Sequence, residues 1–189
     1  MQDTVLKPHD FKQPGITLSG PVDQTMYINF RNQLINCPED GLCVVELSTL
    51  GGDPEVARLM GEDVRFSSDL YPDRRIVFLG KAAIYSAGTT FMSFFARQNR
   101  YLTRGTRLMI HERLMCSSLD LSGPLTTCIA SVQAKLNELE ASIAIQNEGF
   151  AHLVLGSQIS LDDVVQRATS NWYVEANEAA ELGLIEAVI

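Results

Sequence analysis

Three parts of the sequence carry residue types that together could perform acyl transfer. Ser86 stands in GKAAIYSAGTTFMSFFARQ, at the start of a helix-like segment that follows an apolar run. Gly51 and Gly52 follow a second apolar run, LCVVELST, and His111 closes a third, RLMIHE. A serine acts as a nucleophile only when a base such as histidine takes its proton, and this chain provides both residue types.

The two glycine-containing helix starts could stabilise a developing negative charge. Each follows a strand of the kind buried in a parallel sheet, so both helix N-termini should emerge at the carboxyl edge of that sheet. Helix N-termini present unpaired N–H groups, which can bind an oxyanion. Each feature alone also has a structural explanation: a packing serine, a core histidine or a plain turn. Their combination favours a nucleophile at Ser86.

The elements that would position these residues alternate along the chain. Strands are predicted over GITLSG, LCVVELST and DRRIVFLG, and helices over DQTMYINFRNQLIN, SAGTTFMSFFARQ and the segment capped by Asp53 and Pro54. RYLTRGTRLMIHE should be extended, with a turn at Gly105. This alternation predicts an α/β fold with mainly parallel pairing. We expect a polar leader over residues 1–14 and one domain over 15–189.

The segment from about 125 to 154 predicts one long helix. Its apolar residues recur at steps of four, three, four, three and four: Leu125, Ile129, Val132, Leu136, Leu139 and Ile143. Such a helix would be about 45 Å long, and a small domain cannot easily cover the whole stripe. The stripe therefore predicts packing against a neighbouring subunit, and hence a homo-oligomer.

Composition excludes several classes of function. A formal charge of −8 disfavours nucleic acid as a partner. The N-terminus lacks the apolar core of a signal peptide, and no apolar run is long enough to cross a membrane, so we expect a cytoplasmic protein. The cysteines (37, 43, 116 and 128) show no CxxC spacing and the histidines are scattered, which predicts buried free thiols and neither metal nor cofactor.

Three stretches carry a resemblance to a known family. ELSTLGGDPEVARLM, GKAAIYSAGTTFMSFFA and NRYLTRGTRLMIHE resemble the signature stretches of the Clp protease proteolytic subunits, within the crotonase-like fold. The step of 25 residues from Ser86 to His111 matches without a gap, and the resemblance runs from about Gly15 to Ile189. It implies a spiral of strand–strand–helix units with a projecting handle helix, peptide cleavage inside an oligomeric ring, and catalytic roles for individual residues.

By this resemblance Ser86 is the nucleophile, His111 the general base, and Gly52 and Ala87 the donors to the oxyanion. The third member of the triad falls on Asn171, where the family usually has aspartate. An asparagine oxygen can orient the histidine but cannot stabilise its cation as a carboxylate does. A helix-flanking cap is the alternative role for Asn171, and Asp162 or Asp163 could replace it as the third member.

Other departures leave further interpretations open. IYSAG also resembles the SDH-type serine proteases, S-T-L-G-G replaces S-P-G-G, and a leader of about 14 residues argues against docking to an ATPase unfoldase. The chain could instead be a weak or inactive scaffold subunit. It could also be a crotonase-like acyl-CoA enzyme using Glu55 or Glu112, or a serine–lysine protease using Lys81.

Overall fold

The computed structural model of the chain describes residues 5–189. Helices and strands follow one another in this order: η1 (Pro8–Phe11), β1 (Ile16–Ser19), α1 (Gln24–Ile35), β2 (Gly41–Thr49), α2 (Pro54–Leu70), β3 (Arg74–Tyr85), α3 (Ala87–Ser93), η2 (Arg97–Asn99), β4 (Arg100–Leu102), β5 (Arg107–Ile110), α4 (Leu125–Val154), α5 (Leu161–Ala168), β6 (Trp172–Glu175), α6 (Ala176–Glu181) and β7 (Ala187–Val188). The predicted α/β fold is confirmed.

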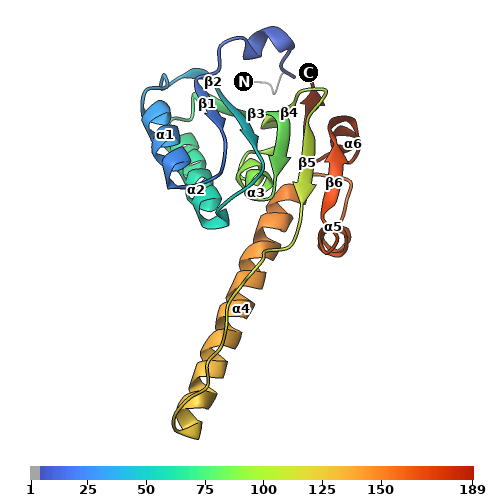
Figure 1. Cartoon of the computed structure of the whole chain (residues 1–189). Helices are drawn as coiled ribbons and strands as arrows, with labels where there is room; N and C mark the ends of the chain where they lie inside the picture. Colours follow the sequence, from blue (N-terminus) through green and yellow to red (C-terminus); the bar gives the residue numbers. More distant parts are fainter. Residues whose placement is uncertain (1–4) are drawn as a thin grey trace.

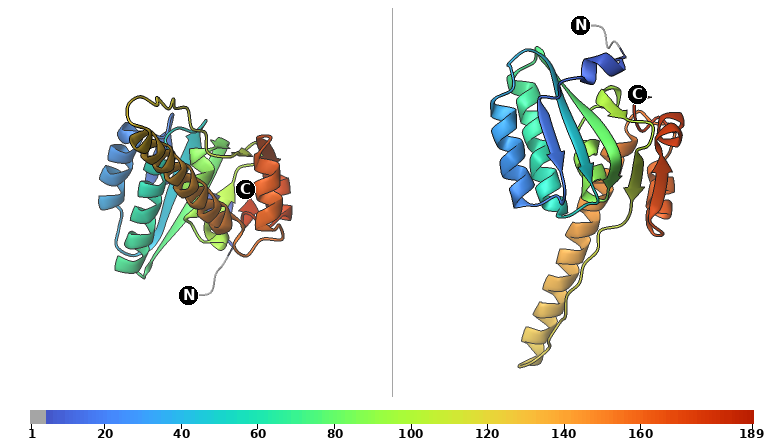
Figure 2. Two further views of the ribbon diagram at one scale, coloured as in Figure 1. Left: turned by 90° about the horizontal axis from the view of Figure 1, so that it is seen from below. Right: turned by 45° about the horizontal axis from the view of Figure 1, so that its top comes forward.

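The strands form one sheet in the order β1-β2-β3-β4-β7, with β5 and β6 branching from β3. Every pairing is parallel except that of β5 with β6, which is antiparallel. Figures 1 and 2 show α1 and α2 side by side on one face of the sheet, with β6, α5 and α6 at the far end. Parallel pairing places the carboxyl ends of β2 and β3 at the same edge.

Alternation along the strands divides the core between the two faces of the sheet. Val45 and Leu47 of β2 pack in the main cluster with residues from α1, α2 and α3, whereas Val44, which precedes Val45, packs on the other face. Phe11 of η1 packs on that second face against Tyr101, with the two rings tilted and their centroids 5.1 Å apart. The predicted polar leader thus contributes a buried aromatic residue, and its first four residues lie outside the described part of the chain.

An irregularity in β3 allows this strand to pair with two different strands along the same edge. The register with β2 shifts between Leu47 and Thr49, and Ala82 within this irregularity has a φ of 59°. Before the shift β3 pairs with β4, and after it β3 pairs with β5. The bulge therefore redirects the end of β3 toward the strand that leads to His111.

Helix α4 has 30 residues and projects away from the body of the molecule, as Figure 1 shows. Only its last part is anchored, through the buried side chains of Phe150 and Leu153. The connection before it, residues 111–124, has no regular secondary structure. The long projecting helix expected from the apolar stripe is present. In residues 5–189 no helix has the length and apolar character needed to span a membrane.

Helix α3 is shorter than predicted. The sequence pattern suggested a helix to about Gln98, but α3 ends at Ser93 and the chain turns to extended backbone at Ala96. Arg100, only 2% exposed, donates from its guanidinium to the carbonyl oxygens of Ser93 and Phe95. These carbonyls therefore have a partner outside the helix, which compensates for the early end.

Candidate active site

Ser86 lies at the junction of β3 and α3 in a strained conformation. Its φ of 53° and ψ of −114° are unusual for any residue other than glycine, and strain of this kind costs about 1–3 kcal/mol. The turn is fixed from both sides, because the Ser86 N–H donates to Met109 O (2.8 Å) and its carbonyl accepts from Thr89 N and Thr90 N. On a sharp strand-to-helix turn of this kind, the hydroxyl of a serine points away from both the strand and the helix.

His111 follows β5 directly and lies next to the serine. Its Nε2 is 2.7 Å from Ser86 Oγ, within hydrogen-bond distance, and both residues are partly buried. This contact depends on the pairing of β3 with β5, which sets Tyr85 opposite Met109. The two residues expected to form the nucleophile–base pair are thus brought together in the structure.

The glycine pair lies against the serine. A side chain at Gly51, whose φ is 112°, would put its Cβ 3.0 Å from Ser86 Cβ, and one at Gly52 would collide with the carbonyl oxygen of Val22. The pair is held by Val22, whose N–H donates to Gly51 O, and by the buried Thr49 hydroxyl, which accepts from Gly51 N–H at 3.0 Å. The sequence analysis did not identify this role of Thr49. The available signal was a threonine at the end of a predicted strand, shortly before two glycines.

Two backbone donors remain available beside Ser86. Within residues 5–189, neither the N–H of Gly52 nor that of Ala87 donates a hydrogen bond to a protein acceptor. Ala87 is the first residue of α3, where an N–H has no acceptor in its own helix. The N–H of Ser86, in contrast, already donates to Met109 O of β5. The arrangement can bind an oxygen that becomes negative when the serine attacks a carbonyl.

Asn171 lies close to His111 along the antiparallel ladder. The last pair of that ladder is Ile110 with Trp172, so the next position on the two strands is occupied by His111 and Asn171. Asn171 is exposed and has a left-handed φ of 55°, and its N–H approaches Ala168 O at 3.4 Å. Its side-chain amide makes no hydrogen bond to His111 among the contacts of the described residues.

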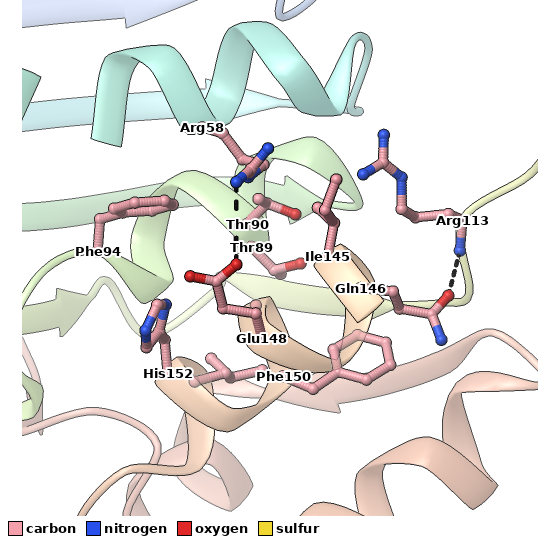
Figure 3. A pocket seen from close by; sticks show the side chains of 12 residues that line it. Arg58, Thr89, Thr90, Phe94, Arg113, Ile145, Gln146, Glu148, Phe150 and His152 are labelled. Atoms are coloured by element: carbon pink, nitrogen blue, oxygen red, sulfur yellow. Dashed lines mark hydrogen bonds and ion pairs between the residues drawn. The ribbon is translucent and has the colours of Figure 1, made fainter. Parts of the chain in front are cut away.

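A pocket lies one turn of α3 beyond the serine, between α2, α3 and the base of α4 (Figure 3). It is partly open to solvent. Thr89, in its wall, donates its hydroxyl to the Ser86 carbonyl oxygen at 2.7 Å. At its rim Arg58 faces Glu148 across 3.8 Å, and the Arg113 N–H donates to Gln146.

Other residues that the sequence offered as catalytic candidates form ion pairs or hydrogen bonds with residues outside the Ser86–His111 pair. Lys81 forms an ion pair with Glu46 at 2.6 Å, and Asp163 accepts from Ser160 at the start of α5. Glu55 lies between Arg58 and Arg113; burial raises its pKa, but hydrogen bonds from the two guanidinium groups bring the pKa below its usual value. These contacts leave Lys81 and Glu55 poorly placed to act as bases. Residues 5–189 contain no group of three metal-ligating side chains.

The fold and the position of the serine at the end of β3 define the chain as an α/β protein of the ClpP-like fold. A solved structure with this fold is ClpP1 from Listeria monocytogenes, in a variant with one asparagine replaced by aspartate, which matches with a TM-score of 0.68. The match covers 92% of this chain and 90% of that chain at 16% sequence identity, so it shows the fold alone. Neither a family model nor a curated protein matches the sequence.

Proposed function

We propose that this chain is a serine peptidase of the Clp type. The observation that carries the proposal is the 2.7 Å contact between His111 Nε2 and the oxygen of a strained Ser86, beside two unused N–H donors. A serine needed only for packing would require neither the strained backbone nor an imidazole in contact with its hydroxyl. The ClpP-like fold supports the same conclusion.

In the proposed mechanism, each step of peptide cleavage is assigned to a group of this site. The Ser86 hydroxyl attacks the peptide carbonyl while His111 Nε2 takes its proton, and the N–H groups of Gly52 and Ala87 bind the oxyanion. The C–N bond then breaks as His111 returns the proton to the leaving amine. Water, activated by the same imidazole, hydrolyses the acyl-enzyme. Asn171, at the end of β6, would orient the imidazole through its amide oxygen.

The pocket beside α3 would receive a substrate side chain. Its walls combine apolar side chains and two threonines with charged and polar side chains, and Thr90 and Ile145 lie near each other in Figure 3. Ile145→Trp should fill this space and lower peptide turnover, while a small fluorophosphonate still reacts with Ser86. Equal loss of both reactions would contradict this role, because it would indicate damage to the serine itself.

Assembly would take place through α4. The stripe predicted from the sequence is exposed along its whole length, with exposed fractions between 40% at Leu139 and 82% at Leu125. Exposed apolar surface of this extent is unusual on a monomer, and a second copy of the same helix offers a matching surface. We therefore propose a homo-oligomeric ring or pair of rings that encloses the serines.

The test is covalent labelling followed by intact-mass measurement. Wild type treated with a fluorophosphonate should gain one adduct, and Ser86→Ala should gain none. Ser93→Ala is the matched control, because Ser93 lies on the same helix but its hydroxyl donates to Thr90 O and not to a histidine, and it should label like wild type. Absence of an adduct on folded, assembled wild type would refute the peptidase assignment.

A scaffold subunit with little activity is the second candidate. It is favoured by one observation, the missing hydrogen bond between the Asn171 amide and His111. A normal assembly without labelling at Ser86 would select this function.

A further inference from the structure

The side chains of Cys37 and Cys43 form a buried pair of thiols away from the candidate active site. Cys37 follows α1 and Cys43 is the third residue of β2. Their Sγ atoms are 2.9 Å apart, with the Cys43 S–H donating to Cys37. The side chains are free thiols, 8% and 2% exposed, and formation of a disulfide of about 2.05 Å needs only a small further approach of the sulfurs.

A buried cation lies next to the pair. The Arg74 guanidinium donates to Pro38 O (3.1 Å), approaches Cys37 O at 3.5 Å, and packs over the Tyr71 ring. The hydrogen bond from Cys43 outweighs burial and, with a smaller contribution from the Arg74 charge, lowers the pKa of Cys37 to about 7. The same hydrogen bond, together with burial, raises the pKa of Cys43. The pKa values of the two thiols are therefore shifted in opposite directions, which favours ionisation of Cys37 over Cys43.

Only one of the two cysteines lines a pocket that is open to solvent. A second pocket, partly open to solvent, lies between α1 and the end of α2, and Cys37 and Arg74 contribute to its wall. Cys43, on the sheet side, does not line it. A small reagent that enters this pocket meets Cys37 first, in the presence of a guanidinium that stabilises its thiolate.

We propose that Cys37 and Cys43 form a peroxide-reactive dithiol that closes reversibly to a disulfide. The Cys37 thiolate attacks one oxygen of the peroxide, the O–O bond breaks, and the released hydroxide takes up a proton to become water. Cys43 then attacks the sulfur of the resulting sulfenic acid, the S–O bond breaks, and a second water leaves. The two thiols are oxidised, the peroxide is reduced, and a thiol reductant restores both cysteines by exchange.

The disulfide would tie the end of α1 to the start of β2 across the turn at residues 38–40. Gly51 and Gly52 follow the opposite end of β2, so oxidation should leave labelling of Ser86 unchanged. The dithiol can thus be tested whether or not the chain is a peptidase.

The experiment uses the full chain with Cys116→Ser and Cys128→Ser, which removes the two thiols that are exposed or partly exposed. One equivalent of hydrogen peroxide should lower the intact mass by two hydrogen atoms, and a thiol reductant should restore it. Adding Cys43→Ser should convert the product to a sulfenic acid that dimedone traps on Cys37. Adding Cys37→Ser should leave Cys43 unoxidised, because no route from the pocket reaches it.

Peptide mapping of the oxidised wild-type chain needs no substitution and guards against variants that do not fold. A linked peptide containing Cys37 and Cys43 is the expected product. Oxidation of Cys116 alone, oxygen adducts on Cys37 without linkage, or equal reactivity of Cys43 in the Cys37→Ser variant would each overturn the proposal.

Discussion

Replacement of Arg100 by methionine should destabilise the whole domain. The guanidinium is buried and charged: burial, with Arg97 nearby, lowers its pKa only to about 10, so the cation persists at neutral pH. It donates to five carbonyl oxygens, those of Ser93, Phe95, His152, Leu153 and Leu184.

The expected loss can be worked out from these bonds. Hydrogen bonds from a charged group contribute about 1.5–3 kcal/mol each, but taking the guanidinium out of water costs several kcal/mol. Methionine fills much of the volume and leaves the carbonyls without a donor. We therefore expect Arg100→Met to reduce the free energy of unfolding by about 3–5 kcal/mol, a large share of the stability of a typical domain.

Urea unfolding followed by circular dichroism measures this loss. Arg97→Met is the control, since Arg97 is partly exposed, donates to Ile185 O and pairs with Glu186, and should cost no more than about 1 kcal/mol. A midpoint for Arg100→Met that matches the control would refute the argument that the five carbonyls depend on this cation.

Three further predictions concern the site, the assembly and pH. Asn171→Asp should raise the rate of fluorophosphonate labelling about tenfold or more, because a carboxylate stabilises the cation of His111. An unchanged rate would show that residue 171 does not act on His111. Leu136→Asp should reduce the assembly to the monomer mass in light scattering, whereas Asn137→Asp, off the apolar stripe, should not; an intact assembly would contradict burial of the stripe. Burial and a nearby guanidinium lower the pKa of His152, so its native state favours the neutral ring and loses stability as pH falls below about 6.5. Urea midpoints should therefore fall more between about pH 7.5 and 5.5 for wild type than for His152→Gln, and equal losses would be evidence against the shift.

The sequence predicted those features that depend on local patterns. Buried β-branched runs indicated the parallel strands, Asp53 was correctly expected to cap α2, and the apolar spacing identified α4. These signals are local, because burial and capping act within a few residues. The contact between Ser86 and His111 cannot be derived from a local pattern. The two residues are 25 positions apart in the sequence, and the pairing of β3 with β5 brings their side chains to 2.7 Å.

Features that depend on distant contacts were missed. The bulge in β3, the antiparallel β6 and the early end of α3 all arise from pairings or side chains outside the segment concerned. The expectation of buried thiols was wrong for Cys116, which is exposed, and for Cys128, which is partly exposed, because both lie on the projecting part of the molecule. The spacing of Cys37 and Cys43 gave no indication that their sulfurs meet.

The position of Arg100 links the candidate active site to the projecting helix. Helix α3 begins immediately after Ser86, and its last carbonyls are held by the same guanidinium that holds the last turn of α4. A displacement of α4, for example when a second copy binds its apolar stripe, would pull on carbonyls at the far end of the helix that begins at Ser86. Because α3 is only 7 residues long, little of such a displacement could be absorbed before it reached the serine. If the chain assembles through α4, we therefore expect assembly to affect the geometry of Ser86, and Arg100→Met should weaken fluorophosphonate labelling as well as stability, even under conditions in which the variant remains folded.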